Sequence, residues 1–457
     1  MTSNSKTAKI IICIIFAAAL INPPVNASDY TVDITPLMQT ESYVLMDGGT
    51  GQVLLEKNMS ARMYPASITK VMTALLAFES GAPLSSVITM SYDAVWSVGR
   101  DTSHIALDVD EQLTLEQALY ALAIESGNDA ANGIAELLGG TMENFAAMMS
   151  SRAIELGAAD THFANAHGLP EPSHYTTARD MALIMAAAIK YPEFNKIFGA
   201  VTYSMPPTNK QPEPRTFNRK HSLNEGMYAY GGLLAEKTGW TSDAGYTYVS
   251  AASRGGRSLV LVLMRSPDPT ARWEDATRLF DYGFDAFTSV SFTAEEIAKE
   301  NYAAVFAGGV TASMRLVPEG GFDCLILKSL SKADVTIGYA LYADGGITGK
   351  AVFSLGAGAP MYNVLGEAGM RVYLDAAACE ITLPEQGGVN EPGEQQGVEG
   401  AVAAALAGIY KVVSLVLQII GAIAVLIIIY YIRRYIAVRK IKKQRRLQGG
   451  NGKQCRH

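Results

Sequence analysis

The chain has 457 residues, of which 49% are hydrophobic and 18% are charged. This length is enough for two or three domains with buried cores, and the composition excludes a wholly disordered chain. Four cysteines in a chain of this size exclude a fold built on disulfides. Thirteen of the 37 Lys and Arg residues lie in the two ends, so residues 28–399 hold 24 basic and 44 acidic residues. Such an acidic body excludes a broad nucleic-acid-binding surface.

The first 27 residues have the organisation of a secretory signal. Two lysines precede an apolar run from Ile10 to Ile21, and the sequence V-N-A at 25–27 supplies small residues for cleavage. The alternative is an N-terminal membrane anchor, but the run is short for a membrane span. We therefore predict a signal peptide over residues 1–27.

The next elements are a hairpin and a series of helices. Two β-prone runs flank the turn D-G-G-T-G at 47–51, which predicts a hairpin over residues 43–57. A helix is predicted from Ser67 to Glu79, where it stops before G-A-P. Three threonines are predicted to cap later helices at Thr114, Thr141 and Thr177.

Strands return in the second half of this region. β-Rich runs at 233–240, 246–252 and 259–264 precede a helix expected over residues 269–287. Because helices separate the early hairpin from these later runs, we predict one sheet with an inserted helical subdomain. Residues 28–289 would then form an α/β (α+β) domain.

Residues 290–385 alternate short β-prone segments with glycine turns, which predicts a small all-β domain. Residues 386–399 are rich in Gly, Glu and Gln and form a predicted linker. Cys324 and Cys379 are the two cysteines between the ends, and the sequence leaves open whether they pair.

The C-terminal region predicts a membrane anchor over residues 400–432. Residues 412–432 carry no charge and, at about 1.5 Å per residue, are long enough to cross a hydrocarbon core. The tail at 433–457 is basic, and positive charge stays on the cytoplasmic side of a membrane. A helix lying in the interface is the alternative. With the signal peptide, this predicts a single-pass cell-membrane protein whose main domain is extracytoplasmic.

The predicted helix at 67–79 begins with Ser67 and carries Lys70 one turn later, on the same face. Because this helix is apolar nearly all round, it should be buried, and a buried lysine has a lowered pKa. A neutral Lys70 could accept the hydroxyl proton and make Ser67 a nucleophile. Taken alone the S-x-x-K pattern is weak, because it also occurs at Ser3 and Ser329.

Two further patterns lie later in the chain. The sequence S-G-N at 126–128 follows an apolar run and, by itself, is typical of a turn between helices. The sequence K-T-G at 237–239 lies in a predicted strand and, by itself, is a lysine at a strand end. A cation and a hydroxyl on a strand suit a substrate carboxylate, and a glycine leaves the strand edge open to an extended peptide.

The three patterns share the order of the motif set of penicillin-binding proteins and class A β-lactamases. The sequence resembles the D-alanyl-D-alanine carboxypeptidases, the low-molecular-mass penicillin-binding proteins. The resemblance is strongest over residues 40–287 and includes N-A-H-G-L at 165–169 and T-T-A-R-D at 176–180. It implies a β-lactamase/transpeptidase-like domain, followed here by the all-β domain and the transmembrane helix.

The resemblance also implies a role for each site residue. Ser67 would attack the penultimate D-Ala of a peptidoglycan stem peptide, with Lys70 as general base and Ser126 as proton relay. The substrate-binding residues would be Asn128, Lys237, Thr238 and Gly239. The backbone N–H groups of Ser67 and Trp240 would form the oxyanion hole. The family uses no metal or organic cofactor, and β-lactams would inhibit by acylating Ser67.

Alternatives stay open at this stage. A transpeptidase would share the acyl-enzyme, and so would a β-lactamase, although the E-x-x-L-N pattern of class A enzymes is missing from the loop region. A non-catalytic wall-binding membrane protein should have lost Ser67, Lys70 or Lys237, yet all are present. Three histidines suggest a metal site, but their spacing fits no common zinc pattern: His162, His167 and His174.

Overall fold

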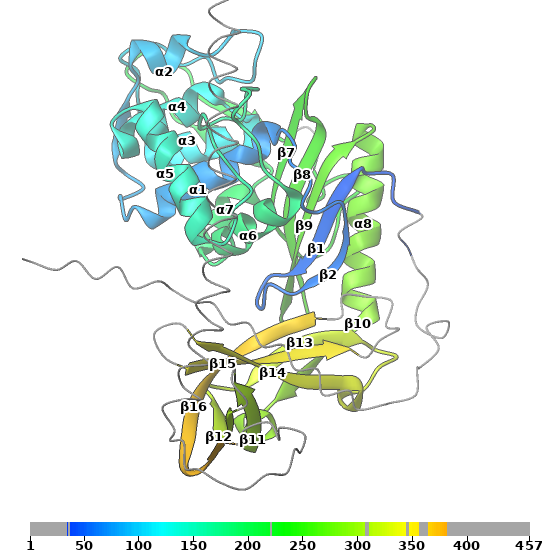
Figure 1. Cartoon of the computed structure of the whole chain (residues 1–457). Helices are drawn as coiled ribbons and strands as arrows, with labels where there is room; N and C mark the ends of the chain where they lie inside the picture. Colours follow the sequence, from blue (N-terminus) through cyan, green and yellow to red (C-terminus); the bar gives the residue numbers. More distant parts are fainter. Residues whose placement is uncertain are drawn as a thin grey trace, which may run out of the picture. The chain divides into compact units, whose positions relative to one another are not determined.

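The computed structural model shows a mixed α/β fold around one main sheet (Figure 1). It describes residues 34, 37–219, 222–306, 310–343, 347–355 and 364–381. The predicted signal peptide, linker, membrane anchor and basic tail all lie outside these residues. Within the described ranges, no helix combines the length and the apolar character that a membrane crossing requires.

Five antiparallel strands form the main sheet, in the order β2-β1-β9-β8-β7. The N-terminal hairpin supplies β1 (Ser42–Asp47) and β2 (Val53–Lys57). The later strands are β7 (Leu233–Thr241), β8 (Gly245–Arg254) and β9 (Arg257–Ser266). The predicted hairpin and the three predicted strands are therefore confirmed, and β1 pairs directly with β9.

Both faces of the sheet are buried at β9, which explains why this strand has a continuous apolar run. Alternate residues of β9 enter different cores. Val260, Val262 and Met264 pack against the inserted helices, whereas Leu259, Leu261 and Leu263 pack against α8 (Pro269–Ala286). Figure 1 shows this layering, with the helical block on one side of the sheet and α8 on the other.

The inserted subdomain begins with a 3₁₀ turn, η3, and continues through seven helices. These elements are η3 (Ala66–Thr69), α1 (Lys70–Glu79), α2 (Tyr92–Trp96), α3 (Leu115–Tyr120), α4 (Asn128–Gly139), α5 (Met142–Glu155), α6 (Ala178–Ala188) and α7 (Pro192–Phe198). The three predicted caps are confirmed, because the hydroxyls of Thr114, Thr141 and Thr177 each accept the backbone N–H three residues on.

Two short ladders in this region were not predicted from the sequence. They pair β3 (Val87–Thr89) with β4 (Gln112–Thr114), and β5 (Thr202–Met205) with β6 (Arg215–Asn218). Strands of three or four residues are too short to show an alternating pattern, which is why sequence reasoning missed them.

The strand-rich segment after α8 belongs to the same compact unit as the main sheet. Its elements are β10 (Phe287–Phe292), α9 (Ala294–Ile297), β11 (Lys299–Phe306), β12 (Val310–Pro318), β13 (Phe322–Leu327), η5 (Lys332–Asp334), β14 (Val335–Ala343), β15 (Ile347–Leu355) and β16 (Val364–Ile381). Cys324 is buried with a free thiol, and burial raises the pKa of that thiol to about 11. The side chain of Cys379 lies outside the described part of the structure.

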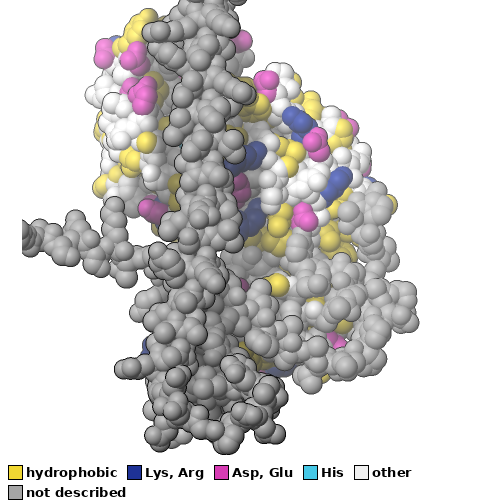
Figure 2. Space-filling view, in the orientation of Figure 1, with side chains coloured by type: hydrophobic (Ala, Val, Ile, Leu, Met, Phe, Trp, Pro, Cys, Tyr) yellow, Lys and Arg dark blue, Asp and Glu magenta, His cyan; other side chains and the backbone are white. Residues whose placement is uncertain are grey.

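On the face seen in Figure 2, Lys and Arg side chains are interspersed with Asp and Glu. Opposite charges that alternate in this way give no strong local potential of one sign. The coloured side chains that this view leaves uncovered therefore form no basic patch of the kind that nucleic-acid-binding proteins use.

Gln52, next to the hairpin turn, binds the strand-rich segment through two hydrogen bonds. Its Nε2 donates to the backbone oxygen of Leu325 over 2.7 Å, and the backbone N–H of Leu325 donates to its Oε1 over 2.7 Å. Both residues are buried. The side-chain amide thus takes the place that a neighbouring strand would have beside β13.

Replacing Gln52→Ala should lower the free energy of unfolding by about 2 kcal/mol, because two buried backbone groups of Leu325 lose their partners. Urea unfolding of the full-length chain measures this change. Gln39→Ala is the matched control, because the exposed Gln39 amide donates only to Glu274 on the surface. Equal losses in the two variants would contradict the role given to Gln52.

Candidate active site

Ser67 lies in the η3 turn that precedes α1. The residue before it, Ala66, adopts a left-handed backbone conformation with φ of +51°, which costs a residue with a Cβ about 1–2 kcal/mol. The predicted helix over 67–79 therefore begins as a strained 3₁₀ turn and becomes α-helical at Lys70. Strain of this kind persists only where surrounding contacts enforce it, and it is common in active sites.

Lys70 is the buried centre of the site, with its side chain fully out of contact with solvent. Its Nζ donates to Ser67 Oγ over 3.0 Å, to Asn128 Oδ1 over 2.7 Å and to the backbone oxygen of His167 over 2.8 Å. Burial lowers the pKa of Lys70 to about 7, and the charge of Asp129 opposes this shift. Near neutral pH the amine can therefore lose its proton and accept one from Ser67.

Asn128 holds Lys70 at the start of α4. While its Oδ1 accepts from Lys70, its Nδ2 donates to Thr102 Oγ1 over 3.1 Å, and the side chain is buried. Both ends of the amide are thus engaged inside the protein. The second N–H of Nδ2 and the second lone pair of Oδ1 remain available for a substrate amide, the role that the resemblance implies for Asn128.

Ser126 follows a π-helical turn, η4 (Ala121–Glu125), and has a left-handed backbone with φ of 60°. Its Oγ is buried and has no hydrogen-bond partner among the described atoms. Ser126 lies two positions before Asn128 in the chain. Its hydroxyl makes no hydrogen bond to Ser67 or Lys70. A buried hydroxyl without a partner is uncommon and needs an explanation, such as a catalytic role.

The third motif lies in the second half of β7, which is an edge strand of the main sheet. Lys237 is buried and its Nζ donates to the backbone oxygen of Thr238 over 2.7 Å. Burial, together with the positive charges of Lys70, Arg219 and Arg272, holds the pKa of Lys237 well below its usual value. A bound carboxylate would offset that cluster of positive charge.

Gly239 brings β7 directly against the nucleophile turn. A Cβ at Gly239 would overlap Thr247 Oγ1 and would lie 2.8 Å from the backbone nitrogen of Ser67. The next residue, Trp240, continues β7 with 60% of its side chain exposed, and its ring centroid lies 6.3 Å from that of Tyr246. The structure therefore brings the backbones of Ser67 and β7 together, as an oxyanion hole requires.

Arg272 is a site residue that the sequence analysis missed. It extends from α8 toward β8, where its Nη1 donates to the backbone oxygen of Thr247 over 3.3 Å, while its buried Nε has no described partner. Thr247 pairs with Gly239 across β7 and β8, so this cation lies behind the motif strand. Burial lowers the pKa of Arg272 to about 10. The feature of the sequence that could have identified Arg272 is its position on the apolar face of the helix predicted over residues 269–287.

The three histidines have separate partners. His167 contributes its backbone oxygen to Lys70, His162 contacts the backbone oxygen of Ser173 at the surface, and His174 is fully buried beside Thr69. In the described residues, no group of three or more His, Cys, Asp or Glu side chains could hold a metal ion.

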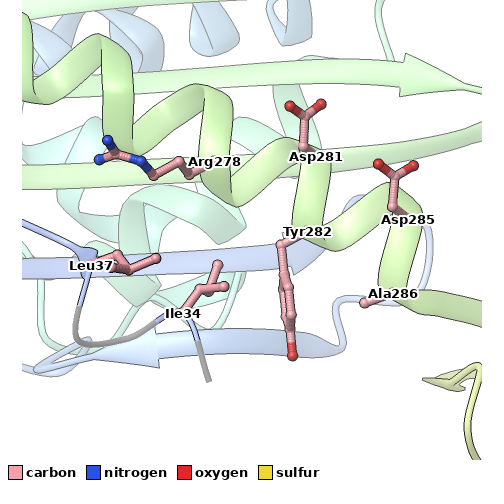
Figure 3. A pocket seen from close by; sticks show the side chains of 7 residues that line it. All are labelled: Ile34, Leu37, Arg278, Asp281, Tyr282, Asp285 and Ala286. Atoms are coloured by element: carbon pink, nitrogen blue, oxygen red, sulfur yellow. The ribbon is translucent and has the colours of Figure 1, made fainter. Parts of the chain in front are cut away.

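Two surface hollows lie away from these residues. Figure 3 shows one of about 500 Å³, lined by Ile34, Leu37 and the α8 residues Arg278, Asp281, Tyr282, Asp285 and Ala286. The other, of about 430 Å³, lies between the hairpin turn at 47–50 and Cys324. No residue of the S-x-x-K, S-G-N or K-T-G motifs lines either hollow, so both hollows are separate from the candidate active site at Ser67.

Replacing Gly239→Ala should lower the free energy of unfolding by about 2 kcal/mol, because β7 and the nucleophile turn must move apart. The matched control is Gly231→Ala, at a glycine ahead of β7 whose Cβ would meet nothing within 4 Å. Urea unfolding of the full-length chain compares the two variants. A Gly239→Ala protein as stable as the control would show that this close approach does not constrain the site.

The chain is similar to known proteins over the region that contains this site. The family model for D-alanyl-D-alanine carboxypeptidases matches residues 30–268. A D-alanyl-D-alanine carboxypeptidase of Bacillus subtilis is 33% identical over 254 residues, which cover 54% of this chain and 63% of that protein. One from Haemophilus influenzae is 30% identical over 373 residues, covering 76% and 90%. The crystal structure of penicillin binding protein 5 from Haemophilus influenzae aligns with a TM-score of 0.60, 27% identity, and coverage of 75% and 98%.

Proposed function

The chain belongs to the D-alanyl-D-alanine carboxypeptidase family of serine peptidases, and on this premise we propose that it removes the terminal D-alanine from peptidoglycan stem peptides ending in D-Ala-D-Ala. One observation carries the proposal. A buried lysine whose pKa is about 7 lies 3.0 Å from the hydroxyl of Ser67, beside an edge strand that an extended peptide can join.

We propose the following acylation step. Ser67 Oγ gives its proton to neutral Lys70 and attacks the carbonyl carbon of the penultimate D-Ala. The resulting oxyanion lies between the backbone N–H groups of Ser67 and Trp240. When the C–N bond breaks, the proton on Lys70 passes through the Ser126 hydroxyl to the nitrogen of the leaving D-alanine.

Deacylation restores the enzyme. A water molecule gives a proton to Lys70 and attacks the ester carbonyl, and the tetrahedral intermediate then releases the shortened peptide as Ser67 Oγ takes that proton back. The terminal carboxylate of the substrate is held by Lys237 and Thr238, with Arg272 as a further cation behind the strand. β-Lactams would acylate the same serine and block the site.

We further propose the organisation that the sequence predicts around this domain. Residues 1–27 would direct export, residues 400–432 would anchor the chain, and the hydrolase would lie outside the membrane. The support is the uncharged run at 412–432 and the basic residues after it. Residues 290–385 would form a small β domain that acts as a stalk or a platform for partners.

The rate of acylation should depend on pH with a midpoint near 7, because only neutral Lys70 accepts the proton of Ser67. Below that midpoint the rate constant should fall about tenfold per pH unit, and above it the rate should level off. Stopped-flow acylation by a fluorescent penicillin measures this profile. Lys190→Ala, at an exposed lysine, should leave it unchanged. A rate constant that does not change between pH 5 and pH 8 would rule out Lys70 as the base.

The decisive experiment measures D-alanine release from a D-Ala-D-Ala-terminated peptide by the full-length chain in detergent, with and without penicillin. We expect release that penicillin blocks and that Ser67→Ala lacks. Lys70→Ala should lose acylation while its thermal unfolding shows a folded protein. A penicillin adduct on Ser67 without release would indicate a transpeptidase, and neither adduct nor release would indicate a non-catalytic wall-binding protein.

A further inference from the structure

A series of hydrogen bonds connects His174 to the backbone beside Ser67. The backbone N–H of Ala164 lies 3.1 Å from His174 Nδ1. On the other side of the ring, His174 Nε2 lies 3.0 Å from Thr69 Oγ1, which in turn lies 2.9 Å from the backbone oxygen of Ala66. Through this series, the loop after α5 reaches the nucleophile turn.

The direction of each hydrogen bond follows from what each group can do. A backbone N–H only donates, so His174 Nδ1 carries no proton and the neutral ring carries its proton on Nε2. The backbone oxygen of Ala66 only accepts, so Thr69 gives it the hydroxyl hydrogen. Thr69 Oγ1 must then accept from His174 Nε2, and all three bonds point toward Ala66.

The last bond, from Thr69 to the backbone oxygen of Ala66, restrains the peptide group that carries the N–H of Ser67. The carbonyl of Ala66 and the N–H of Ser67 belong to one planar peptide group, so fixing the oxygen also fixes the direction of the N–H. Ala66 needs this restraint, because its φ of +51° is unfavourable. Gly168 packs against the same carbonyl so closely that a Cβ at that position would overlap it.

The surroundings keep His174 neutral, as the series requires. His174 and Thr69 are both fully buried, and Phe163 packs edge-on against the imidazole at 5.6 Å between ring centroids. Burial, followed by the positive charges of His162 and Lys70, lowers the pKa of His174 to about 3. The ring therefore keeps a single tautomer across the pH range in which Lys70 titrates.

We propose that His174 is a positioning residue which, through Thr69, holds the Ala66–Ser67 peptide so that the Ser67 N–H points at the developing oxyanion. This inference rests on the proposed function, because it explains what orients the N–H of Ser67, one of the two groups proposed to donate to the oxyanion. Loss of the restraint should slow formation of the acyl-enzyme and leave the initial binding of the acyl donor unchanged.

Two pairs of variants of the full-length chain distinguish loss of the hydrogen bonds that orient the Ser67 N–H from loss of side-chain packing. Thr69→Val keeps the shape of the side chain but has no hydroxyl, whereas Thr69→Ser keeps the hydroxyl. His174→Gln can still donate toward Thr69, whereas His174→Asn can accept from Ala164 but is too short to reach Thr69. His162→Asn is the matched histidine control, because its ring bonds only to a surface backbone oxygen.

The measurement is the acylation rate constant with a fluorescent penicillin, separated from the binding constant by stopped flow. Thr69→Val and His174→Asn should each lower the rate constant about tenfold with little change in binding. Thr69→Ser, His174→Gln and His162→Asn should stay within about twofold of the original chain. The double variant T69V/H174N should be no slower than T69V alone, because both changes break one series.

Several results would overturn the inference. Thr69→Val with the original rate constant, His174→Gln as slow as His174→Asn, or multiplied losses in the double variant would each do so. If His174→Asn does not fold, the Thr69 pair still decides. Failure of the original chain to react with penicillin would instead reject the proposed function itself.

A second readout does not depend on activity. In the chain labelled with ¹⁵N-histidine, His174 should show the Nε2–H tautomer by nuclear magnetic resonance at pH 7, and Thr69→Val should shift the Nε2 signal alone. A protonated His174 or the Nδ1–H tautomer would contradict the directions assigned to the hydrogen bonds.

Discussion

The buried amine of Lys70 is the constraint that organises the site. A lysine becomes a base near pH 7 when burial removes it from water and no carboxylate pairs with its amine. Its three partners come from η3, from the start of α4 and from the 165–169 loop, and none of them is a carboxylate. The nearby Asp129 is occupied by the backbone N–H groups of Ile105, Leu107 and Ala130, so its charge only partly opposes the effect of burial.

Two glycines explain why the motifs must meet at one point. Gly168 approaches the carbonyl of Ala66 from the loop after α5, and Gly239 approaches the nitrogen of Ser67 from β7. The peptide between Ala66 and Ser67 is therefore held between two backbones, where a Cβ on either glycine would not fit. The H-G-L and K-T-G sequences, which look unrelated in the chain, thus shape opposite sides of the same peptide unit.

The sequence predicts the elements of this fold better than their contacts. The main-sheet strands and α8 have clear apolar patterns, and the threonine caps have local signals, so these elements were predicted close to their observed bounds. The left-handed conformation of Ala66, the π-helical turn before Ser126 and the buried position of Arg272 depend on tertiary packing that no local pattern encodes. Likewise, the sequence shows that the spacing of His174 from the other histidines fits no common zinc pattern, but it does not show that the partner of His174 is Thr69.

The strand order of the main sheet sets the time at which this site can form. β1 lies beside β9, so Tyr43 pairs with Leu263, and the hairpin that begins the domain has no further strand to pair with until the last strand of the sheet has been made. Pairings between residues so far apart in sequence form late and slowly in folding. The sheet that carries the β7 edge beside Ser67 is thus incomplete in any shorter nascent chain. For a chain exported unfolded, as proposed here, the hydrolase would first assemble on the side of the membrane where its substrate lies.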